Sequence, residues 1–234
     1  HRDLHSFPTR RSSDLAEYTA AYNADDPKIK LKIDHTYRVA ALCERIAKAA
    51  GMCAYDVELA WLSGMLHDVG RFEQIKRYNT FSDADSVDHA KFGADLLFKD
   101  GLISTFLNGM VKCTGYKPGA LEDRYSSDGV FLYDRLNKSD MEMLELAIRC
   151  HNMYRIPQGL NRREQAFCNV LRDADKVDIF KVNIDTPLEE IYNTTTEELM
   201  KSDITDEVLE AFDEEHCILK AIRRTPAEDR KSVV

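Results

Sequence analysis

Histidine and aspartate are the residue types in this chain whose spacing could do chemistry. Four of the seven histidines, His35, His67, His89 and His151, lie on or at the ends of segments with an apolar helical pattern, and His67 is followed directly by Asp68. Imidazole together with carboxylate suits iron, manganese, zinc and similar metals. A bound divalent ion can turn water into a nucleophile near neutral pH, and two ions can clamp the attacking and leaving oxygens. These residues therefore indicate a metal site that activates water.

The candidate ligands must be positioned by helices, because apolar residues recur at helical spacing along most of the chain. The pattern from Ile33 to Ala50 is expected to end at Gly51, and a second helix that follows Asp56 is expected to end at Gly70. Ser139–Glu142 has the pattern of a capping box that opens another helix. Further helical segments are expected over 87–99, 144–151, 163–180, 187–200 and 206–222, and a short apolar stretch covers 102–111. No alternating strand series is present in the sequence, which predicts an all-α fold.

We expect the chain to consist of one domain flanked by two terminal segments that are not native to the protein. Residues 1–15 and 229–234 contain HSFPTRRSSDL and DRKSVV, which match what a sequencing-adapter oligonucleotide encodes and fit no apolar pattern. Such tails are excluded from reasoning about the fold. The domain is then expected over 16–228, with an irregular insertion over 100–138 and C-terminal helices over 186–228.

Composition limits the class of protein. The net charge of −9 argues against a partner that is a long nucleic acid or an anionic membrane. No apolar run approaches the roughly 18 residues that a transmembrane helix needs. Six scattered cysteines without a CxxC pair, in a chain with no evident signal peptide, indicate reduced thiols and a cytoplasmic location.

Three stretches of the sequence are similar to a known family. DHTYRVA contains His35, LSGMLHDVGR contains His67 and Asp68, and RDADKVDIF contains Asp175. These stretches resemble the HD-domain superfamily of metal-dependent phosphohydrolases, whose ordered pattern is H…HD…D, and the resemblance covers most of residues 30–180. It implies a bundle of helices whose ends converge on the metal site.

Members of the superfamily with two metals add histidines between the HD pair and the last aspartate, where His89 and His151 stand. The resemblance then implies that Asp68 bridges two divalent transition-metal ions, iron or manganese first, with zinc, cobalt, nickel or magnesium as alternatives. The first ion would be held by His35, His67 and Asp175, and the second by His89 and His151. Asp173 and Asp178 compete with Asp175 for the last place, since all three lie within one and a half helical turns.

The resemblance implies hydrolysis of a small phosphorylated molecule, such as a nucleotide, by a metal-bound hydroxide. Arg71 and Lys176 are the candidate phosphate contacts, with a solvated-charge role as the alternative, and Arg38 and Arg155 are weaker candidates. The insertion over 100–138 could form one wall of the pocket.

The segment HNMYRIPQGL is also similar to the HD-GYP branch, which cleaves cyclic dinucleotides. Asn152 stands where that branch has a second histidine, and the DGxGYP string is absent. Both departures argue against cyclic-di-GMP as the substrate. His216, which lies outside the pattern, is expected to be structural.

Two other functions fit the same residues. A minority branch of the superfamily uses a similar ligand set as a di-iron oxygenase that oxidises polyols or phosphonates. A non-catalytic sensor module is the third possibility, and the filled ligand positions argue against it. The sequence does not indicate an oligomeric state.

Overall fold

The computed structural model describes residues 18–23, 25–106, 136–185, 195–214 and 218–229. All regular elements in these ranges are helices, so the prediction of an all-α fold is confirmed. The helices of the bundle are α2 (Pro27–Ala49), α3 (Ala54–Leu66), α4 (Val69–Tyr78), α5 (His89–Ala94), α7 (Lys138–Cys150) and α8 (Arg162–Asp185), and a π-helical turn at Asp95–Lys99 continues α5.

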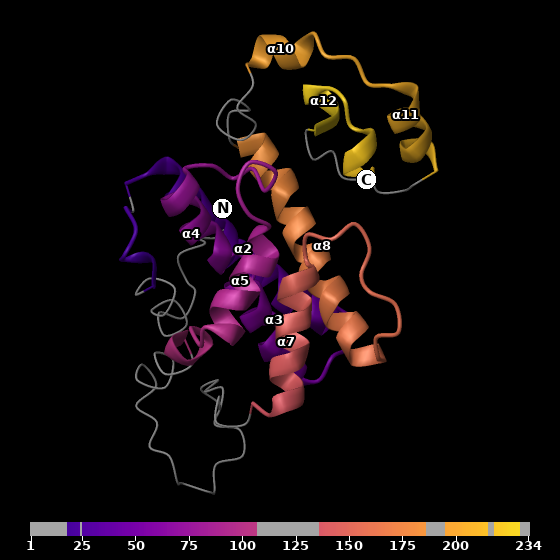
Figure 1. Cartoon of the computed structure of the whole chain (residues 1–234). Helices are drawn as coiled ribbons and strands as arrows, with labels where there is room; N and C mark the ends of the chain where they lie inside the picture. The colour runs from indigo at the N-terminus through magenta and orange to yellow at the C-terminus, as the bar shows by residue number, and fades with distance from the viewer. Residues whose placement is uncertain (1–17, 24, 107–135, 186–194, 215–217, 230–234) are drawn as a thin grey trace, which may run out of the picture.

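The helices α2, α3, α7 and α8 pack side by side around a common core, and α4 and α5 lie against them (Figure 1). The core is built from apolar side chains that are at most 1 % exposed, among them Val39, Leu62, Leu144, Phe167 and Leu171. Burial of one such side chain stabilises the fold by about 1.5–3 kcal/mol relative to its exposure. These contacts hold the helix ends in place.

Helix α2 begins six residues before the predicted start at Ile33. Asp26 is its N-cap and accepts a hydrogen bond of 2.8 Å from the backbone N–H of Lys28. Pro27 occupies the first helical position, where its missing N–H costs nothing. In the six additional residues, PKIKLK, lysine alternates with apolar side chains, so helical apolar periodicity did not reveal them, and they bring Lys32 into the helix.

The helix predicted to run through to Gly70 is instead two helices. Helix α3 ends at Leu66, and α4 begins at Val69 after a break at His67 and Asp68. Gly70 is part of α4, where a Cβ atom would lie 2.3 Å from the carbonyl oxygen of His89. The glycine therefore permits the close approach of α4 to α5, and it does not terminate a helix.

The capping box of α7 lies two residues before the predicted one at Ser139. Asn137 is the N-cap: its side chain accepts from the Asp140 N–H at 3.0 Å, and Asp140 accepts from the Asn137 N–H at 3.2 Å. Asp140 is fully buried, and Tyr55 and Arg163 also donate to it. These tertiary contacts favour Asp140 over Glu142 as the acidic member of the box.

The C-terminal part consists of α10 (Thr196–Met200), α11 (Asp206–Asp213), a 3₁₀ turn at Lys220–Ile222 and α12 (Pro226–Asp229). These short helices lie together beyond the C-terminal end of α8 (Figure 1). No helix among the described residues is both long enough and apolar enough to cross a membrane. The tail predicted over 1–15, most of the insertion over 100–138, residues 230–234 and His216 lie outside the described residues.

Candidate metal centre

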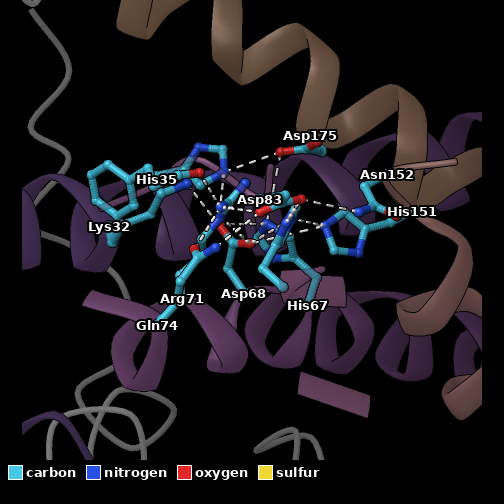
Figure 2. Close-up of polar contacts among 12 residues, drawn as sticks. Lys32, His35, His67, Asp68, Arg71, Gln74, Asp83, His151, Asn152 and Asp175 are labelled. Atoms are coloured by element: carbon cyan, nitrogen blue, oxygen red, sulfur yellow. Dashed lines mark hydrogen bonds and ion pairs between the residues drawn. The ribbon is translucent and has the colours of Figure 1, made fainter. Parts of the chain in front are cut away.

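The six candidate ligands come together between the helices. Five of them are labelled in Figure 2: His35, His67, Asp68, His151 and Asp175. Five of the side chains are buried, and Asp175 is 16 % exposed. They come from six places in the chain: His35 from α2, His67 from the end of α3, Asp68 from the break before α4, His89 from the start of α5, His151 from the end of α7 and Asp175 from α8.

One half of the cluster faces the Oδ2 atom of Asp68. The Nε2 atoms of His35 and His67 lie 3.7 Å and 3.5 Å from this oxygen. Asp175 Oδ1 lies 3.1 Å from His35 Nε2 and 3.7 Å from His67 Nε2. Two imidazole nitrogens and two carboxylate oxygens therefore surround one small volume.

The other half of the cluster faces the Oδ1 atom of Asp68. The Nε2 atoms of His89 and His151 lie 3.6 Å and 3.9 Å from this oxygen and 3.1 Å from each other. The two oxygens of one carboxylate thus face two separate pairs of histidines.

Each histidine of the cluster has an outer nitrogen, Nδ1, on the side of the ring away from the cluster. The hydrogen bond of this nitrogen determines which ring nitrogen carries the proton. The Nδ1 atoms of His67 and His151 are each 2.7 Å from a backbone carbonyl oxygen, of Gly64 and Ile148. A carbonyl only accepts, so each Nδ1 carries a proton, and the neutral form of each ring has its lone pair at Nε2. His89 has the same tautomer, because its Nδ1 lies 2.7 Å from a carboxylate oxygen of Asp83.

This arrangement fits a cation better than a set of hydrogen bonds. His67 Nε2 is buried and has no hydrogen-bond partner among the described residues. The Nε2 atoms of His89 and His151 turn lone pairs toward each other. Buried polar atoms are normally paired, and neutral imidazole nitrogens held by an outer hydrogen bond are typical metal ligands. Groups within this cluster could each hold a metal ion, His35, His67 and Asp175 in one and His67, Asp68 and His151 in another.

The protonation states suit metal binding. Burial lowers the pKa of His67 to about 4, and burial together with the charge of Arg71 lowers that of His89 to about 3. Burial alone would raise the pKa of Asp68, but Lys32 and the neighbouring imidazoles hold it well below its usual range. At neutral pH these histidines are neutral and Asp68 is ionised, which are the forms that bind metals.

His35 differs from the other three histidines. Burial and Lys32 act to lower its pKa, but hydrogen bonds with Asp175 and Asp178 raise it above the ordinary value. Asp178 Oδ2 lies 2.6 Å from His35 Nδ1, and Arg38 donates to both oxygens of Asp178, at 2.6 and 2.9 Å. Asp178 therefore orients His35 from outside, whereas Asp175 faces the cluster.

Sequence reasoning missed the roles of Asp178, Asp83 and Lys32. Asp178 follows Asp175 by three residues, and this helical spacing could have indicated its position. Lys32 precedes His35 by one turn of α2, and its Nζ lies 2.7 Å from Asp68 Oδ2. Asp83 lies in the connection between α4 and α5, and no periodic pattern could have indicated it.

Arg71, predicted to contact a substrate phosphate, is 5 % exposed and already bonded. Its Nη1 atom donates to Gln74 Oε1 at 2.6 Å, to the Phe81 carbonyl at 2.6 Å and to Asp83 Oδ1 at 2.7 Å. Its Nε atom lies 3.8 Å from Asp68 Oδ1. A phosphate contact by Arg71 stays a prediction.

The remaining predicted residues lie farther toward solvent. Lys176 is half-buried beside Asp175, and its predicted phosphate contact also stays a prediction. Asp173 is exposed. Asn152 donates to Asp88 at 2.9 Å, and the exposed Arg155 stacks over the Tyr154 ring at 5.3 Å.

The comparisons with known proteins agree with this geometry. The family model described as HD domain matches residues 33–180, which is more than half of the chain and contains all six cluster residues. No curated protein and no solved structure is similar enough to the chain to be matched. The matched range and the His/Asp cluster inside it lead to one conclusion: the chain belongs to the HD-domain family.

Proposed function

We propose that this protein is a metal-dependent phosphohydrolase that holds two divalent ions and cleaves a phosphoester or phosphoanhydride of a small phosphorylated molecule, such as a nucleotide. The observation that carries the proposal is the position of Asp68, whose Oδ2 faces His35 and His67 while its Oδ1 faces His89 and His151. One carboxylate so placed can serve two ions at once.

In this proposal Asp68 would contribute to both metal sites, His35, His67 and Asp175 would hold the first ion with it, and His89 and His151 would hold the second. When bound, two such ions supply a nucleophile from water and offset negative charge on phosphorus-bound oxygens. Iron, manganese and zinc suit a set of imidazoles and carboxylates, whereas magnesium prefers oxygen.

The surrounding protein orients the donors and limits the access of water. Hydrogen bonds on the outer nitrogens fix each imidazole, so little reorganisation is needed when a charge develops at the centre. Asp175 and Lys32, with side chains 16 % and 18 % exposed, are open to solvent where a substrate could enter.

A small substrate is favoured over a polymer. The net charge of −9 repels long nucleic acids, and a compact phosphorylated molecule is affected less. The positive charge of two ions would attract its phosphoryl group locally.

The test is a hydrolysis screen of nucleotides, dinucleotides and sugar phosphates with Mn²⁺ or Fe²⁺, together with a measurement of bound metal. Asp175→Ala is expected to abolish turnover, whereas Asp173→Ala, an exposed aspartate on the same helix, serves as the matched control. Absence of turnover in folded protein with two bound ions would contradict the proposal. Oxygen uptake by the iron form would then indicate the di-iron oxygenase, and failure to bind metal would indicate a sensor module.

A further inference from the structure

Lys32 is a cation placed directly at the proposed two-ion site. Its Nζ atom lies 2.7 Å from Asp68 Oδ2, and its side chain is 18 % exposed. The residue sits one turn before His35 on α2, so both side chains point to the same cluster (Figure 2). The Phe81 ring lies 5.4 Å from the ammonium and favours a cation there.

The two arginines nearest to the cluster each have a carboxylate of their own. Arg38 is bound through two nitrogens by Asp178, and Arg71 Nη1 lies 2.7 Å from Asp83. Asp178 and Asp83 are not among the six proposed ligands, so these two ion pairs can persist when metal binds. Arg71 also approaches Asp68, but its Nε lies 3.8 Å from Oδ1, farther than the 2.7 Å between Lys32 Nζ and Oδ2.

The ion pair of Lys32 differs from those two, because it involves a proposed metal ligand. Its carboxylate partner is Asp68, whose Oδ2 is also a proposed metal ligand. A divalent ion on that oxygen would place a second positive charge close to the ammonium, and like charges at such short range in a partly buried site repel strongly. An anion that contacts both the ion and the ammonium removes this repulsion.

We propose that Lys32, and not Arg71, binds the phosphoryl oxygens of the substrate, and that metal and phosphate bind cooperatively because of it. A lysine ammonium has three donors on a flexible stem, so it can turn from Asp68 to a phosphoryl oxygen without breaking another ion pair. This inference rests on the two-ion site of the proposed function and names the residue that recognises the anion there.

The experiment measures Mn²⁺ affinity by calorimetry with and without saturating inorganic phosphate. Coupling between two ligands is reciprocal, so phosphate should tighten Mn²⁺ binding in the unmodified protein by about tenfold or more. In Lys32→Met, Mn²⁺ alone should bind more tightly than in the unmodified protein, and the enhancement by phosphate should fall below about twofold. Lys32→Arg should retain part of the enhancement. Lys48→Met, which removes an exposed lysine from the same helix, is the matched control.

Three results would overturn the inference: no enhancement in the unmodified protein, an unchanged enhancement in Lys32→Met, or a folded Lys32→Met that no longer binds Mn²⁺. Lys32→Gln provides a polar variant if the methionine variant does not fold. The readout needs no turnover, so it is independent of the hydrolysis screen. A protein that couples phosphate to metal through Lys32 but hydrolyses nothing would refute the proposed reaction and leave this inference standing.

Discussion

The Nε2 atoms of His89 and His151 lie 3.1 Å apart, and hydrogen bonds place the proton of each ring on its other nitrogen. In the neutral forms of the two rings, two lone pairs thus face each other in a buried site, held there by the packing of α5 against α7. A cation between the two nitrogens would turn this unfavourable contact into a pair of ligand bonds. The pair is therefore a place in the cluster where a second ion would relieve an unfavourable contact.

We expect His151→Ala to lower the number of bound Mn²⁺ ions from two to one per chain, because it removes one of only two imidazoles near Asp68 Oδ1 among the described residues. Elemental analysis after dialysis measures the ratio. Asn152→Ala changes the adjacent, exposed residue and should leave the ratio unchanged. A variant at His151 that still binds two ions would argue against the assignment.

Removal of metal should destabilise the protein. An ion present at about 100 times its dissociation constant stabilises the folded state by about 2.7 kcal/mol. For a domain of this size that corresponds to a fall in Tm of about 5 to 10 °C when a chelator is added. Differential scanning calorimetry of loaded and chelator-treated protein gives the shift, and equal Tm values would show that the cluster holds no ion.

Asp83 is expected to position His89 for the second ion. Its Oδ2 accepts from His89 Nδ1 at 2.7 Å, and Gln74 and Arg71 donate to its Oδ1 at 3.0 and 2.7 Å. Loss of such a partner typically weakens metal affinity by about 10- to 100-fold, so Asp83→Ala should do so in a Mn²⁺ titration. The exposed Asp85 lies in the same connection, and Asp85→Ala should bind as the unmodified protein does.

Gly70 should tolerate no side chain. A Cβ atom there would lie 2.3 Å from the His89 carbonyl oxygen and 2.7 Å from the Gly93 amide nitrogen, both of them backbone atoms. Gly70→Ala is expected to lower the free energy of unfolding by about 1–3 kcal/mol and, by displacing α5, to weaken metal binding.

Gly51→Ala separates backbone strain from displacement of the site. Gly51 has a φ of +71°, and its Cβ would meet nothing within 4 Å. Its alanine variant should lose about 1 kcal/mol through strain and keep its metal affinity. Equal metal affinities in both variants, measured by titration, would disprove the role given to Gly70.

Stability should fall in acid partly because of Asp140. Burial alone would raise its pKa, but hydrogen bonds from Tyr55 and Arg163 hold the pKa below its usual value. A carboxyl with a lowered folded-state pKa stabilises the protein above its unfolded-state pKa of about 4, and this contribution is lost as the pH falls through the folded value.

Asp140→Asn should therefore lower the free energy of unfolding by about 1.5–3 kcal/mol at pH 7, and the difference should shrink below about pH 4. Urea unfolding at several pH values measures both. Glu142→Gln, at an exposed position of the same helix, should show neither effect. A difference that is constant from pH 7 to pH 3 would rule out this contribution.

The sequence was sufficient to name six residues that lie together, because each stands beside an apolar helical segment and their order matches a family pattern. The sequence was less informative about the residues that contact these six or hold their helices in place. Lys32 was overlooked because apolar periodicity begins one residue later, although Asp26 and Pro27 carry the signal of an earlier helix start. The contact of Asp83 with His89 depends on the path of the chain between α4 and α5, which no periodicity specifies. Gly70 was interpreted as a helix terminator because the local pattern contains no information about a neighbouring backbone.

His35 and Asp175 are 140 positions apart in the chain and 3.1 Å apart in the fold. An unfolded chain would have to close that loop to offer both to one ion, at an entropic cost of about 5 kcal/mol. The ion would consequently discriminate sharply against unfolded or partly assembled molecules. A molecule with bound metal would thus be one in which α2, which carries His35, and α8, which carries Asp175, are both folded into the bundle.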